Sequence, residues 1–142
     1  MKIDDSLLEI HEFHGEGYLP LVEYQGWRVA MLRYCDELLP QHIDKMQRHD
    51  ETDEVFVLLT GRCILFIGEG QQKIHQIYAQ DMQRLKLYNI KKGCYHSHTL
   101  SPDASVLIVE NSGTGNKNST DLYLSMSQQQ QLMELTRDIW KV

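Results

Sequence analysis

The sequence predicts an all-β protein, an antiparallel sandwich or barrel, with one helix at each end. Three observations support this fold class. Short runs rich in β-branched and aromatic residues recur along the chain, turn signals containing Gly or Pro separate them, and no helix intervenes between them. Consecutive strands without crossover helices favour antiparallel pairing over a parallel βαβ sheet. We expect a single domain over residues 1–142, because this length suits one domain and neither a repeat nor a linker divides the chain.

The first element is a short N-terminal helix, predicted over about residues 6–13. The tetrapeptide SLLE that begins at Ser6 matches a capping box, and Gly15 and Gly17 follow as stop signals. The barrel is predicted over about residues 17–125. Its strand-like runs cover residues 18–24, 27–34, 43–49, 54–59, 63–67, 74–78, 85–90, 95–99, 105–110 and 121–124.

The last element is an amphipathic C-terminal helix, predicted over about residues 127–140. A second capping-box pattern begins at Ser127. Leu132, Leu135 and Ile139 then fall on one helical stripe, and we expect this stripe to pack against the barrel.

Three strand-like runs are apolar on both faces, at residues 55–59, 63–67 and 106–109. One face of each run can line the barrel interior, but the opposite face also needs cover. Two short terminal helices offer too little surface for all of these faces, so we expect a second copy of the chain to cover the rest. The sequence therefore predicts a homodimer.

The composition excludes several classes of partner. The 14 Lys and Arg residues against 20 Asp and Glu residues give a formal net charge of −6, which argues against nonspecific binding to nucleic acid or to an anionic membrane surface. No apolar run approaches the roughly 18 residues of a membrane span. Three widely spaced cysteines (Cys35, Cys63 and Cys94) and the lack of a secretory signal predict a cytoplasmic protein with free thiols.

Two polar clusters interrupt the apolar strand pattern. Alternation places Gln47 and His49 on one face of their strand, and His96 and His98 on one face of theirs. We expect the two clusters to meet inside the barrel, together with Glu54. Imidazole nitrogens and a carboxylate held by rigid strands are donors that suit a divalent transition metal.

These residues resemble the two sequence motifs that mark the cupin superfamily. The first motif reads G-x5-H-x-H-x(3,4)-E-x6-G, and here His49, four residues, Glu54, six residues and Gly61 reproduce its second half. The second motif reads G-x5-P-x-G-x2-H-x3-N, and here Gly93 and His96 reproduce its G-x2-H segment.

The resemblance covers roughly residues 17–125 and implies a small single-domain cupin with a jelly-roll β-barrel. It also implies a metal, because cupins typically bind one through three histidines and a glutamate. His49, Glu54 and His96 would be three of the four ligands, and the ion would be Fe, Mn, Ni or Zn.

The chain departs from the first motif at a ligand position, so that motif is degenerate. Gln47 stands where the first histidine belongs, and a neutral amide oxygen is a weak donor. In the second motif, Lys91 stands at the proline position and Leu100 at the final asparagine position. His98, which should face the same way as His96, is a candidate replacement as metal ligand. Gln47 and His98 are also the candidate substrate-binding residues.

Two functions remain open. In the first, a metal-dependent cupin binds and acts on a small polar metabolite at the open positions of its ion. The fold alone does not select a reaction, nor decide whether the protein is an enzyme. In the second, the barrel is a metal-free, non-catalytic module that binds a sugar or a carboxylate through Gln47 and the histidines. Glu54 would then be a structural carboxylate paired with His49 or Arg48. Gln47 favours the second function, whereas His98 favours the first.

Overall fold

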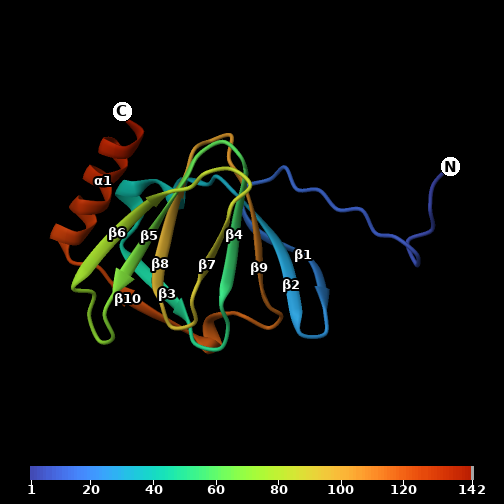
Figure 1. The fold of residues 1–142 in the computed structure, drawn as a ribbon, viewed down its shortest axis with the longest axis horizontal. Helices are drawn as coiled ribbons and strands as arrows, with labels where there is room; N and C mark the ends of the chain where they lie inside the picture. The colour runs from blue at the N-terminus through green and yellow to red at the C-terminus, as the bar shows by residue number, and fades with distance from the viewer. Residues whose placement is uncertain (142) are drawn as a thin grey trace.

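The computed structural model describes residues 1–141 as two five-stranded antiparallel sheets that face each other, followed by one α-helix (Figure 1). Sheet 1 has the strand order β1-β2-β9-β4-β7, and sheet 2 has the order β10-β3-β8-β5-β6. The strands are β1 Gly17–Tyr24, β2 Trp27–Arg33, β3 Lys45–His49, β4 Glu54–Thr60, β5 Cys63–Glu69, β6 Gln76–Asp81, β7 Leu87–Ile90, β8 Tyr95–Leu100, β9 Ser105–Asn111 and β10 Ser119–Tyr123. Most neighbours within a sheet are distant in sequence, as in a jelly roll, so the predicted fold class is confirmed.

The strands follow the predicted runs closely, and the differences lie at their ends. The third run begins at Lys45 rather than at residue 43, because Pro40–His42 forms a 3-10 turn. The seventh begins at Leu87 rather than at residue 85, because Leu85 has a φ of 66°, a left-handed conformation outside the β region. These shifts leave the alternation of inward and outward residues unchanged.

An apolar core fills much of the space between the two sheets. Its buried side chains are Ala30, Leu32, Phe56, Leu58, Cys63, Leu65, Met82, Ile90, Leu100, Ala104, Val106 and Ile108. Within a strand these residues occur at every second position, as the pleat requires. The core therefore determines which face of each strand points inward, and with it the polar residues of the same parity that enter the barrel.

The C-terminal helix α1, Met126–Trp140, confirms the predicted amphipathic helix and covers the outer face of sheet 2 (Figure 1). Leu132 of this helix is fully buried against a second apolar cluster, which includes Met46, Phe66 and Tyr95 of sheet 2. The predicted cap at Ser127 is wrong. Ser125 caps the helix instead, because its hydroxyl accepts a hydrogen bond from the backbone of Gln128 and the Gln128 side chain returns to the Ser125 backbone.

The predicted N-terminal helix over residues 6–13 is wrong. The structure has only a turn there, in which the backbone N–H of Leu7 donates to the carbonyl of Asp4, and the segment extends away from the barrel (Figure 1). Leu7 and Ile10 are 81% and 86% exposed. A helix of this length is unstable without packing, and nothing in residues 1–141 packs against it, so the capping pattern alone does not form one.

In the part of the chain that the structure describes, no helix lies over the outer face of sheet 1, and α1 lies against sheet 2 (Figure 1). Val55 and Val57 of β4 point to this face and are only partly buried, and Leu87 of β7 is 73% exposed. The described residues 1–141 include no helix that is long and apolar enough to cross a membrane.

Candidate metal centre

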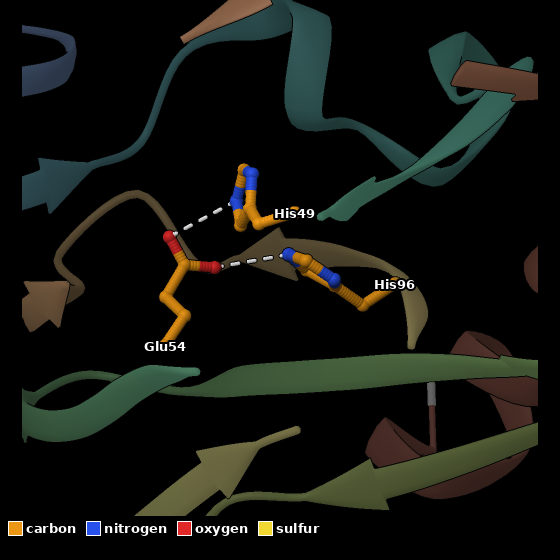
Figure 2. Close-up of side chains that lie close together, drawn as sticks. All are labelled: His49, Glu54 and His96. Carbon is orange, nitrogen blue, oxygen red and sulfur yellow. Dashed lines mark ion pairs between the residues drawn. The ribbon is translucent and has the colours of Figure 1, made fainter. Parts of the chain in front are cut away.

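Three donor side chains that are far apart in sequence meet inside the barrel (Figure 2). His49 ends β3 and His96 lies in β8, both in sheet 2, whereas Glu54 begins β4 in sheet 1. Glu54 Oε1 is 3.0 Å from His96 Nε2, and Glu54 Oε2 is 3.4 Å from His49 Nε2. One donor atom from each residue lies within 4.8 Å of the others. The predicted meeting of the two sequence clusters is therefore present in the structure.

The spacing of these atoms matches that of ligands around one ion. Two atoms bound about 2.1 Å from an ion, at an angle of roughly 90–110°, lie about 3.0–3.4 Å apart. The two distances from the Glu54 carboxylate to the imidazoles fall in this range. The three side chains are 6–11% exposed, so an ion between them would be held away from bulk water.

The hydrogen bonds of the imidazole rings leave both Nε2 atoms facing the centre. His96 Nδ1 lies 3.0 Å from the backbone carbonyl of Cys94, and because a carbonyl only accepts, this nitrogen carries the hydrogen. In neutral His96 the Nε2 lone pair then points at a Glu54 oxygen, which is also an acceptor. A second proton on the ring or a bound metal ion makes this contact favourable. His49 Nδ1 similarly contacts the hydroxyl of Ser119 at 2.8 Å, and such outer contacts are typical of metal-binding histidines.

The imidazoles also determine the charge of Glu54. Burial alone would raise the pKa of this carboxyl, but hydrogen bonding to His49 and His96 outweighs burial and holds its pKa well below the ordinary value. Glu54 is therefore a carboxylate near neutral pH. It contacts both imidazoles and not Arg48, which pairs instead with Asp50 at 2.9 Å.

A second buried acid, Glu110 of β9, adjoins the centre and was not among the candidates from sequence. It pairs across the sheet with Arg28 of β2, whose Nη2 donates to Glu110 Oε1 at 2.7 Å. The hydroxyl of Tyr18 in β1 donates to the same oxygen at 2.5 Å. Alternation could have revealed Glu110, because Val106, Ile108 and Glu110 share one parity and the first two are core residues.

The other two candidates, Gln47 and His98, line the same cavity, and His98 does not belong to the group formed by His49, Glu54 and His96. The Gln47 amide donates to Asp121 on the neighbouring strand at 2.9 Å. His98 stacks obliquely on Phe56, with 5.5 Å between ring centroids, and its Nδ1 is buried without a hydrogen-bond partner among the described residues. Burial lowers the pKa of His98 to about 4, so this ring is neutral at pH 7.

The cavity beside the donors has a volume of about 630 Å³, enough for a small metabolite. Its walls combine apolar side chains such as Leu38, Ile43 and Phe56 with polar groups that include Lys45 and Gln47. A few polar groups on a mainly apolar surface are the usual composition of a small-molecule site.

No family model matches the chain, and no curated protein matches it in sequence. Solved structures share its fold. CapF in complex with the inhibitor 3-isopropenyl-tropolone aligns at a TM-score of 0.56 with 14% identity, over 80% of this chain and 34% of the CapF chain. The chain thus spans about a third of the length of CapF.

Two further solved structures are also similar to this chain. Pac13, described as a unique nucleoside dehydratase, aligns at a TM-score of 0.53 with 11% identity, over 82% of this chain and 88% of its own. A cupin-2 domain containing protein from Shewanella frigidimarina aligns at 0.45 with 20% identity, over 75% and 87% of the two chains. The two-sheet topology, the likeness to CapF and Pac13, and the motif spacing around His49, Glu54 and His96 together show that the chain has the fold of the cupin superfamily.

Proposed function

We propose that the protein binds one divalent transition metal through His49, Glu54 and His96, and that the adjoining cavity binds a small polar molecule. The observation that carries this proposal is the contact between His96 Nε2 and Glu54 Oε1 at 3.0 Å, with His96 Nδ1 committed to the Cys94 carbonyl. A bound metal ion would accept a lone pair from each of these two atoms, so the His96 ring would need no second proton. Two imidazoles and a carboxylate suit Fe, Mn, Ni or Zn.

The metal would supply Lewis acidity, polarising an oxygen atom of a molecule bound in the cavity. The side chains of the barrel would orient that molecule. The Gln47 amide and His98 lie on the sheet 2 side of the cavity, and His98 is a neutral ring that can hydrogen-bond without carrying charge. Phe56 and Leu38 would exclude water from the apolar part of the bound molecule.

The metal content of the purified protein tests this proposal. The protein is stripped with a chelator and reloaded with Fe, Mn, Ni or Zn, and bound metal is measured by elemental analysis. We expect about one ion per chain, and loss of retention in His49→Ala and His96→Ala. His75→Ala is the matched control, because His75 is exposed and lies outside the cavity. Absence of stoichiometric metal from the reloaded protein would contradict the proposal.

The alternative function is a metal-free binding cavity. One observation favours it: the Glu54 carboxylate lies within ion-pair distance of both imidazoles, at 3.4 Å from His49 Nε2 and 3.0 Å from His96 Nε2, so these side chains can pair directly without any ion. The cavity would then bind a sugar or a carboxylate through hydrogen bonds alone. The reloading experiment separates the two functions, because only the first retains metal.

We also propose that the protein forms a homodimer through the outer face of sheet 1. Cross-strand neighbours form a continuous apolar row over all five strands: Leu19, Met31, Leu107, Val57 and Leu87. Five strands about 4.8 Å apart, each contributing a length of about five residues, span roughly 400 Å² of sheet face, to which every second residue points. A patch of roughly 400 Å² is as large as the largest apolar patch on a typical monomer, and such patches are often functional.

The extended segment over residues 1–16 would supply the rest of the dimer interface. A standard interface buries about 800 Å² on each partner, which is more than the sheet face alone provides. Leu7 and Ile10 of this segment are 81% and 86% exposed, and the segment adjoins β1 at the edge of sheet 1. We therefore propose that it packs against the second copy.

The cytoplasmic location predicted from sequence also remains a proposal, with all three cysteines free in the structure.

A further inference from the structure

We infer that Glu110 is a fourth protein ligand of the metal centre and takes the place of the histidine that Gln47 replaces; this inference rests on the metal site proposed above. Glu110 belongs to no motif of the sequence. It lies in β9 of sheet 1, with its side chain 3% exposed. The centre would then combine two imidazoles from sheet 2 with two carboxylates from sheet 1.

The two oxygens of the Glu110 carboxylate have different surroundings. Oε1 accepts hydrogen bonds from the Tyr18 hydroxyl and from Arg28 Nη2. Oε2 is buried and has no hydrogen-bond partner in the part of the chain that the structure describes. A buried acceptor without a partner is costly and calls for an explanation, such as an ion. One oxygen held by neighbouring donors and one oxygen left free is the arrangement expected of a carboxylate ligand.

The free oxygen is directed at the metal centre. Glu110 Oε2 lies 3.9 Å from His49 Nε2, which is less than twice a metal–ligand bond length of about 2.0–2.2 Å. The Glu54 carboxylate is its other neighbour. Two adjacent buried carboxylates repel each other unless a cation or a proton lies between them. A cation bound to His49, Glu54 and Glu110 satisfies all three side chains at once.

The charges of the site are consistent with this arrangement. Two carboxylates balance the charge of a divalent ion, which lowers the cost of burying it. Arg28 does not depend on Glu110 alone, because it also donates to the Thr114 carbonyl at 2.8 Å and lies 3.4 Å from Glu23. Gln47, by contrast, directs its amide at Asp121. Glu110 is therefore better placed than Gln47 to complete the ligand set.

Metal affinity in matched variants tests the role of Glu110. Chelator-treated wild-type protein, Glu110→Gln and Glu23→Gln are titrated with Zn²⁺ by calorimetry, and each is loaded with Co²⁺ for visible absorption spectroscopy. Glu23 is the matched control, because it is a carboxylate that contacts the same Arg28 but is 48% exposed. We expect Glu110→Gln to weaken Zn²⁺ binding tenfold or more and to change the Co²⁺ spectrum. Glu23→Gln should bind Zn²⁺ within about twofold of wild type.

Folding of the variants is checked by circular dichroism. If Glu110→Gln does not fold, the double variant Arg28→Met/Glu110→Gln removes both members of the buried pair and should show the same loss of Zn²⁺ affinity. Zn²⁺ binding by Glu110→Gln within threefold of wild type, with an unchanged Co²⁺ spectrum, would overturn the inference while leaving the metal site intact. A wild-type protein that binds neither Zn²⁺ nor Co²⁺ would overturn the metal site itself and the inference with it.

Discussion

The two sheets of the barrel differ on both of their faces. Toward the cavity, sheet 1 contributes the carboxylates Glu54 and Glu110, whereas sheet 2 contributes the imidazoles of His49, His96 and His98. Toward the outside, α1 covers sheet 2, whereas no helix within residues 1–141 lies over sheet 1 (Figure 1). The site therefore forms only when the two sheets pack together, and the uncovered face of sheet 1 remains available to a partner.

The inner and outer differences have one physical origin. Every strand alternates, so an apolar residue on the outer face and a functional residue on the inner face occupy adjacent positions. Glu54 and Val55 are such a pair in β4, and Val109 and Glu110 are such a pair in β9. Variants at adjacent positions can thus separate the site from the interface.

The largest difference is expected between the two outer faces. Leu132→Ala removes a fully buried side chain from the cover of sheet 2 and should lower the free energy of unfolding by about 2–5 kcal/mol. The matched change Leu107→Ala lies on the partly exposed outer face of sheet 1 and should cost about 1 kcal/mol in the monomer, because less surface is lost. Urea denaturation at low protein concentration measures both, and equal costs would show that sheet 1 is also covered within one chain.

A second difference should appear on acidification. His98 of sheet 2 has a pKa of about 4 in the folded protein, below the ordinary value of 6.5, because burial disfavours the charged ring. The unfolded chain therefore binds more protons between these values. The contribution of neutral His98 to the free energy of unfolding is complete above about pH 6.5. It is lost as the pH falls toward 4, by at most about 3 kcal/mol.

His98→Leu should remove this loss of unfolding free energy at low pH. The measurement is the difference in unfolding free energy between wild type and His98→Leu from pH 7 to pH 4, since subtraction cancels the groups that the two proteins share. His49, whose pKa is raised by Glu54 despite the opposing effect of burial, changes stability in the opposite sense and is common to both. Parallel pH profiles for the two proteins would contradict a buried neutral His98.

A charged residue on the outer face of sheet 1 should weaken the proposed self-association. Met31→Glu places a carboxylate in the middle of the apolar row and should weaken self-association at least tenfold, because the charge would lose its water in the interface. Light scattering should give a mass near twice 16.6 kDa for wild type and near 16.6 kDa for Met31→Glu. Tyr123→Glu, at an exposed position of sheet 2, is the control and should remain dimeric. A wild-type monomer at micromolar concentration would contradict the proposed dimer.

The smallest effect is expected at the cap of the helix that covers sheet 2. Ser125→Ala removes the hydroxyl that accepts from the Gln128 backbone and should lower the free energy of unfolding by about 1 kcal/mol. Ser127→Ala is the control at the position where the sequence places the cap, and it should cost less. Thermal unfolding compares the two, and a larger loss at Ser127 would contradict the observed cap.

The strands, the residues of each strand that face the barrel interior, and the group of His49, Glu54 and His96 could all be predicted from the sequence. Runs of β-branched and aromatic residues bounded by turns carry this information locally, and the motif spacing places the three donors at strand positions that meet in this fold. The N-terminal helix failed as a prediction because a capping pattern does not stabilise a helix that has nothing to pack against.

The contacts of Glu110 with its partners arise only in the folded chain. Arg28 and Tyr18 reach Glu110 because β9 pairs with β2 and β2 with β1, so that side chains more than eighty residues apart in the chain come into contact. The packing of α1 is a second example. The sequence shows that a strand is apolar on both faces, but which sheet face α1 covers depends on how the two sheets pack. Contacts between distant segments arise from the packing of the whole chain, so no local pattern specifies them.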